Sequence, residues 1–126
     1  MQFTSSQNVK AFLSSLGVEA DETIDNYCLN IPDCGELYID SLDGCVGVSL
    51  AHKFPEYLID EFLEKSLTIL HRGISYGVFT SMTVGLQGNN TWVAFSKLQE
   101  TEASANRILE VAEELRRFYL EVKGTK

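Results

Sequence analysis

The chain has 126 residues, a formal net charge of −8 and 44% hydrophobic residues. This length and composition predict one ordered domain over residues 1–126, with a core of its own. The acidic balance argues against nucleic acid and against an anionic membrane surface as partners, since both repel negative charge. The sequence shows no secretory signal and no apolar run long enough to span a bilayer, so we expect a cytoplasmic protein.

A short amphipathic helix is predicted first, from a cap at Thr4 to a stop at Gly17. Its apolar face consists of Val9, Phe12, Leu13 and Leu16. A helix of this length is marginal on its own. It must therefore dock on another part of the chain.

Three strands are predicted next, over residues 27–31, 36–41 and 45–51, because apolar and polar side chains alternate there. Turn chemistry at residues 32–35 and 43–44 separates them and predicts hairpins. The side chains expected to point inward are Leu37, Ile39, Val46, Val48 and Leu50.

The central predicted helix begins at Pro55, which suits a first helical position, and ends at Gly73. Its apolar stripe at helical spacing consists of Ile59, Phe62, Leu63, Ser66, Leu67 and Leu70. Leu58 and Ile69 lie outside this stripe and widen the apolar arc. A surface helix needs only one apolar stripe. The wide arc indicates either two buried faces, one of them on a partner, or a fully buried core helix.

A second hairpin is predicted from residues 76–86 and 91–97, joined by a polar turn at residues 88–90. Both of its faces carry large apolar groups, which fits a hairpin covered on both sides. The last predicted helix runs from a cap at Thr101 to about Val122. The whole order is α-β-β-β-α-β-β-α, which predicts an α+β fold with three helices and an antiparallel sheet of five to six strands.

The sequence contains few residues whose spacing is typical of catalysis or metal binding. Cys45 and His52 are close enough in the chain for a Cys–His pair to be imagined, but no signature surrounds them, and Cys45 also fits as a small strand side chain. Two histidines and three scattered cysteines do not give zinc spacing. We therefore expect no metal, no cofactor and no catalysis. The remaining apolar faces point to a binding module.

Five stretches of the chain resemble a known family: residues 36–40, 46–50, 63–67, 105–109 and 118–119. Together they are similar to the class I chaperones of bacterial type III secretion, the Tir-chaperone or CesT-like family. The resemblance covers nearly the whole chain. It implies a dimer, with itself or with a related chaperone, that binds the N-terminal segment of a secreted effector in extended form. It also implies that the protein keeps the effector soluble and competent for secretion.

With this resemblance, two sets of residues become candidate contacts. The residues expected to bind the effector are Val9, Phe12, Leu13, Leu16, Tyr38, Val46 and Val48. The residues expected in the dimer interface are Leu58, Ile59, Phe62, Leu67, Ile69 and Trp92. Two alternatives remain open: a structural or regulatory dimerisation module of a secretion apparatus, and a small hydrolase that uses Cys45 or a histidine.

Overall fold

The computed structural model describes seven parts of the chain: residues 10–14, 26–31, 34–42, 44–75, 82–88, 90–99 and 101–124. Residues 10–14 are helical. The other elements are β1 (Asn26–Ile31), β2 (Gly35–Leu42), β3 (Cys45–Lys53), α2 (Glu56–Ser75), β4 (Met82–Gln87), β5 (Thr91–Gln99) and α3 (Ala105–Gly124). The predicted α-β-β-β-α-β-β-α order is therefore confirmed.

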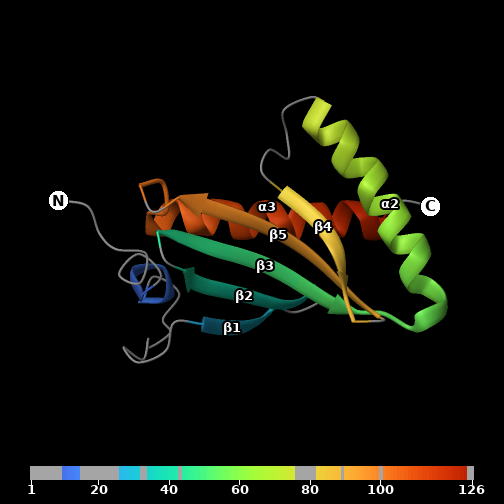
Figure 1. Cartoon of the computed structure of the whole chain (residues 1–126), viewed down its shortest axis with the longest axis horizontal. Helices are drawn as coiled ribbons and strands as arrows, with labels where there is room; N and C mark the ends of the chain where they lie inside the picture. The colour runs from blue at the N-terminus through green and yellow to red at the C-terminus, as the bar shows by residue number, and fades with distance from the viewer. Residues whose placement is uncertain are drawn as a thin grey trace.

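The five strands form one antiparallel sheet in the order β1-β2-β3-β5-β4. The predicted hairpins β1–β2, β2–β3 and β4–β5 are all present. The central strand is β3, and α2 connects it to β4 at the edge of the sheet. In Figure 1, α3 runs behind the sheet, while α2 lies at the end of the sheet where β3 finishes.

The strands alternate between two faces, as their period of two requires. The face that α3 covers holds the core. Its buried side chains include the five predicted inward residues, which are Leu37, Ile39, Val46, Val48 and Leu50. From α3 the core receives Ile108, Val111, Leu115, Phe118, Tyr119 and Val122.

The second hairpin is less covered than predicted, and even on the face of Trp92 its ladder partner Leu86 is 41% exposed. Trp92 and Ala94 have no exposed surface, whereas Val93 and Phe95, on the other face, are half-buried. The part of this hairpin predicted at residues 76–81 lies outside the described residues.

The buried stripe of α2 also differs from its prediction. Ile69 is 7% exposed although it was placed outside the stripe, and Leu67 is 46% exposed although it was placed inside. Ser66 is fully buried, so the step of three residues to Ile69 keeps the stripe facing the sheet. Gly73 does not end the helix, which continues to Ser75. A glycine permits a left-handed stop but does not impose one.

The start of α3 is the third difference. Thr101 does not cap the helix, because residues 101–102 form a turn in which the Glu102 N–H donates to the Gln99 carbonyl at 2.8 Å. The cap is Ser104, whose Oγ accepts the Arg107 N–H at 3.2 Å.

Trp92 joins three elements at the centre of the core. Its indole N–H donates to Ser66 Oγ of α2 at 3.0 Å, and the Ser66 hydroxyl donates to the Leu63 carbonyl at 2.8 Å. The Trp92 ring lies 5.3 Å from the Phe62 ring, 6.0 Å from Phe118 and 5.7 Å from Tyr119, measured between centroids. These contacts fix α2 and α3 against β5.

We expect Ser66→Ala to lower the free energy of unfolding by about 1–3 kcal/mol, because it leaves the buried indole N–H without an acceptor. The matched control is Thr68→Ala, since the exposed Thr68 hydroxyl also donates to a carbonyl of its own helix, that of Glu64 at 3.0 Å. Urea unfolding measures the free energy of unfolding of both variants. If the two variants are equally stable, the Trp92–Ser66 hydrogen bond does not hold α2 in place.

Candidate functional site

The imagined Cys–His pair is not formed. Cys45 begins β3 and His52 lies near its end, seven residues away, which is about 23 Å along a strand. The contact of His52 is instead with Cys34, whose carbonyl oxygen lies 3.2 Å from His52 Nδ1. His71 is exposed in the last turns of α2. No nucleophile and base are therefore brought together at Cys45.

The exposed thiol of Cys28 lies in a small polar cluster. Its S–H donates to Glu36 Oε2 at 3.6 Å, and the Tyr38 hydroxyl donates to the same oxygen. Partial desolvation and the adjacent carboxylate raise the pKa of the Cys28 thiol, and the hydrogen bond to Glu36 raises the pKa of Tyr38. A raised pKa disfavours the thiolate that catalysis or metal binding needs. No group of metal-ligating side chains occurs among the residues that the structure describes.

The face of the sheet opposite α3 is a candidate binding surface, and we call it the open face. One row across it runs Cys28, Tyr38, Ser49, Phe95 and Thr83, in register across all five strands. Neither α2 nor α3 covers it in Figure 1. Tyr38, Val93 and Phe95 are half-buried there, so each keeps apolar surface that a partner can cover.

Two hollows indent the open face. One, of about 470 Å³, lies between β4, β5 and β3 and is lined by Ser49, Val93 and Phe95 among others. The other, also about 470 Å³, lies toward the end of β3 and includes Tyr38 and Ala51. Burial raises the pKa of the Asp40 carboxyl, which lines the first hollow. The open face thus carries apolar, uncharged polar and charged groups, the last including Glu36, Asp40, Lys53 and Lys97.

Most of the residues predicted to contact an effector do not lie on this surface. Phe12, Leu13, Val46 and Val48 are at most 1% exposed and belong to the core. Tyr38 alone of the described set lies on the open face, since it alternates with Ile39, the partner of Val48 in the ladder. The other two residues of the set, Val9 and Leu16, lie outside the described residues. The structure therefore does not bring the set together, and its role in binding stays a prediction.

Of the residues predicted for a dimer interface, some are buried in the core and others are exposed. Four of them are buried within the protomer, namely Ile59, Phe62, Ile69 and Trp92. Leu58 and Leu67 are 38% and 46% exposed. They are nine residues apart, which at about 100° per residue puts them on opposite flanks of α2. A hollow lined by Leu67, Thr68, His71 and neighbouring charged residues marks the Leu67 flank.

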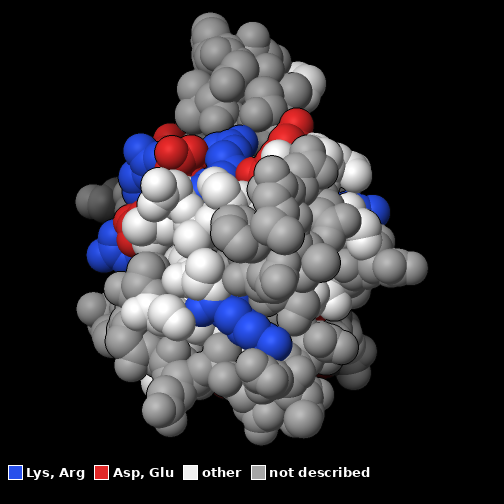
Figure 2. All heavy atoms as spheres, turned by 90° about the vertical axis from the view of Figure 1, so that its left-hand side faces the viewer, with Lys and Arg blue, Asp and Glu red and all other residues white. Residues whose placement is uncertain are grey.

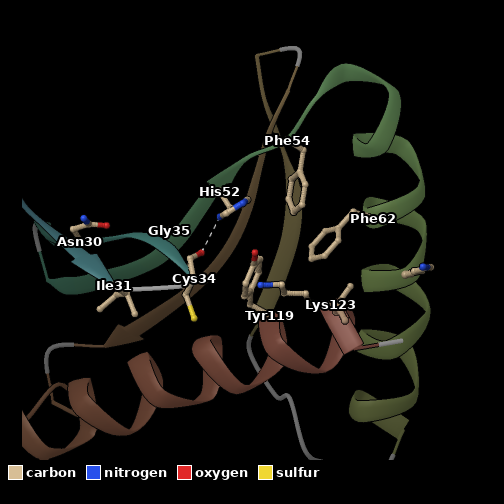
Figure 3. Close-up of a pocket in the computed structure, with 11 residues that line it drawn as sticks. Asn30, Ile31, Cys34, Gly35, His52, Phe54, Phe62, Tyr119 and Lys123 are labelled. Carbon is tan, nitrogen blue, oxygen red and sulfur yellow. Dashed lines mark hydrogen bonds between the residues drawn. The ribbon is translucent and has the colours of Figure 1, made fainter. Parts of the chain in front are cut away.

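A fourth hollow, which no sequence pattern predicted, lies where β1, β2, β3, α2 and α3 meet; we call it the His52 cavity. Its volume is about 530 Å³, within the range of ligand sites. Aromatic rings form its wall (Figure 3): the His52 ring lies 4.6 Å from Phe54 and 5.2 Å from Tyr119, and Phe54 lies 4.3 Å from Phe62. The lining extends in sequence from Asn30 to Lys123, so no local spacing could reveal the cavity.

Gly35 shapes this cavity because no other residue fits its position. Its φ is +116°, and a Cβ there would lie 2.3 Å from the Ala51 carbonyl oxygen and 3.1 Å from His52 Nδ1. The close approach of β2 to β3 thus brings the Cys34 carbonyl to the His52 ring.

Figure 2 shows the end of the molecule at which α3 begins, where described acidic and basic side chains are interspersed. Arg107, for example, pairs with Glu110 at 3.0 Å. A nucleic-acid interface requires a basic patch, and none is visible on this face among the described residues. Of the helices that the structure describes, none is both long and apolar enough to cross a bilayer.

We expect Gly35→Ala to destabilise the protein more than Gly44→Ala. Both glycines have positive φ, but a Cβ at Gly44 meets nothing within 4 Å. In the Gly44 variant the free energy of unfolding should fall only by the cost of the left-handed backbone, about 1–2 kcal/mol. In the Gly35 variant a clash with β3 should lower it further. Urea unfolding and the NMR signals of the His52 ring measure the two effects. Equal stability and unchanged His52 signals would show that the close approach is not needed.

No protein-family model matches this sequence, and no curated protein matches it. Solved structures do match. A chain of the heterodimeric complex ExoU–SpcU from the type III secretion system of Pseudomonas aeruginosa aligns with a TM-score of 0.68 and 14% identity, covering 90% of this chain and 93% of that one. A chain from the Yersinia pestis type III secretion chaperone SycH in complex with a stable fragment of YscM2 gives a TM-score of 0.66 at 14% identity, with 94% and 99% covered.

The E. coli protein YbjN, described as a putative transcription regulator, aligns with a TM-score of 0.65 and 14% identity, covering 93% of this chain and 90% of that one. Identities this low establish the fold and no more. The chain thus has the fold found in structures of type III secretion chaperone complexes, over nearly its whole length.

Proposed function

We propose that the protein is a type III secretion chaperone, which binds the N-terminal segment of a secreted effector and keeps it soluble and competent for secretion. The observation that carries the proposal is the agreement in fold, over 90% and 94% of this chain, with chains from the ExoU–SpcU and SycH–YscM2 complexes. The sequence resemblance at residues 36–40, 46–50 and 63–67 supports the same family. We place the protein in the bacterial cytoplasm, where an effector must be held before export.

The open face suits an extended partner. A segment without a fold of its own loses conformational entropy when it is ordered, so it needs a wide apolar surface in return. Tyr38, Val93 and Phe95 supply apolar area across β2 and β5. The edge strands β1 and β4 each pair with a single described strand, which leaves an edge where a further strand can add.

This surface modifies the predicted binding set. Tyr38 stays in the proposed contact surface. Phe12, Leu13, Val46 and Val48 support it from the core, where they hold the strands in place. The site is thus proposed to be the open face, with Phe95 near its centre.

We infer that the protein does no chemistry of its own. Cys45 and His52 are separated along β3, and the pKa of the Cys28 thiol is raised. Binding without turnover needs neither a Cys–His pair nor a reactive thiolate. We keep a second candidate, a regulatory module that acts by binding another protein, because the fold is shared with YbjN, which is described as a putative transcription regulator. The two candidates differ in whether the partner is exported.

Co-expression tests the proposal. The chain should solubilise and co-purify with a secreted protein encoded beside it, and should fail with the same protein lacking its N-terminal segment. Phe95→Asp should weaken the capture by placing a charge on the apolar part of the open face, whereas Leu109→Asp, on α3, should not. If a folded chain solubilises no neighbouring secreted protein, the chaperone proposal is wrong; capture of a partner that stays in the cytoplasm favours the regulatory module.

We also propose a dimer through α2, with Leu67 in the interface and either a second copy or a related chaperone as partner. For the purified chain alone, light scattering at micromolar concentration should give twice the 14.1 kDa chain mass. Leu67→Asp should dissociate it, because a charge buried in an apolar interface has no partner. Leu109→Asp is the matched control, since Leu109 is similarly exposed at 39%. A monomeric parent chain contradicts the homodimer, and a dimeric Leu67→Asp variant contradicts this interface.

A further inference from the structure

The His52 cavity combines an aromatic wall with an unusual charge. Eleven residues line it, and none of them is Asp or Glu, although the protein as a whole carries a net charge of −8. Two of them, Lys65 and Lys123, are cationic. The cavity is therefore a locally positive site in a negatively charged protein.

Lys123 is the cation available to a ligand. Its side chain extends from the last turn of α3 into the cavity beside Tyr119 (Figure 3). Among the described residues, the structure gives Lys123 no carboxylate partner. Lys65 already pairs with Glu61 at 3.2 Å. One positive charge thus stands beside the Tyr119 ring, in the cavity that His52 and Phe54 also line.

This arrangement selects one kind of ligand. The charge of Lys123, unpaired among the described residues, disfavours a cation, in spite of the aromatic wall. The cavity also adjoins the C-terminal end of α3, whose free carbonyl groups repel a multiply charged phosphate more strongly than a single carboxylate. The rings favour an apolar or aromatic body, and Lys123 favours a single carboxylate beside it.

The cavity also adjoins a hollow of the open face. Asn30, Gly35 and His52 line both the cavity and the hollow that holds Tyr38. A chain lying on the open face can therefore pass the end of β3 and insert one side chain into the cavity. A polypeptide fits this path, whereas a small molecule would leave the connecting hollow unused.

We propose that the His52 cavity binds an aromatic side chain that is followed by a carboxylate in an extended partner segment. The aromatic ring lies among His52, Phe54 and Tyr119, and the carboxylate pairs with Lys123. The chemical preference follows from the cavity alone. Its assignment to an effector segment rests on the proposed function.

Short peptides test the preference without any effector. The full chain, labelled with ¹⁵N, is titrated with acetyl-Gly-Phe-Glu-Gly-amide, acetyl-Gly-Phe-Gln-Gly-amide and acetyl-Gly-Ala-Glu-Gly-amide. A fourth peptide, acetyl-Gly-Phe with a free carboxylate, distinguishes a chain end from an acidic side chain. We expect the Phe-Glu peptide to shift the amide signals of His52, Phe54 and Tyr119. It should bind about two- to fivefold more tightly than the Phe-Gln peptide, the difference expected of a partly exposed ion pair.

Two lysine variants complete the test. Lys123→Gln should remove the preference for Phe-Glu over Phe-Gln, while Lys97→Gln, an exposed lysine on β5, should keep it. The proposal is overturned if the parent binds both peptides equally, if Lys123→Gln keeps the preference, or if the shifted signals lie away from the cavity. Co-expression reads out the proposed function separately. If the parent chain shows no peptide preference but captures an effector, only the ligand proposed for the cavity is refuted. If it shows the preference but captures no effector, only the chaperone proposal is refuted.

Discussion

The burial of one indole N–H constrains much of this fold. Trp92 has no exposed surface, so its N–H must find an acceptor inside the protein, and it finds one in Ser66 Oγ. That hydrogen bond fixes the rotation of α2 about its own axis. Phe62 on α2 and Phe118 and Tyr119 on α3 then pack around the same ring. The two helices are thereby positioned by a single residue of β5.

The surfaces left for partners follow from this arrangement. Because α3 covers one face of the sheet, Tyr38, Val93 and Phe95 on the other face remain half-exposed. Because Ser66 faces Trp92, Leu67 is turned outward. The open face is broad and keeps apolar surface at these three side chains, and this property suits the binding of another polypeptide chain.

Strand periodicity carried most of the successful prediction. The alternation at residues 27–31, 36–41 and 45–51 located three strands and their inward side chains, because a strand with one buried face must alternate. The turn residues recognised at 32–35 and 43–44 predicted the two hairpins that these strands form. These signals are local, so a single sequence contains them.

What the sequence could not show depends on contacts between distant residues. Leu67 and Ile69 are both apolar, and the packing of α2 against α3, β4 and β5 decides which of them is buried. Thr101 and Ser104 can both cap a helix, and the turn that follows β5 decides between them. The His52 cavity draws its lining from residues between Asn30 and Lys123, none of which forms a motif with another.

The central claim is that the open face of the sheet, and not the outer side of α3, receives the partner. Hydroxyl-radical footprinting of the chain alone and in its captured complex measures this directly, residue by residue. The account predicts that labelling of Tyr38 and Phe95 falls in the complex, while labelling of Leu109 and Leu120, which are exposed on α3, does not change. Protection of Leu109 and Leu120 with unchanged labelling of Tyr38 and Phe95 would contradict it.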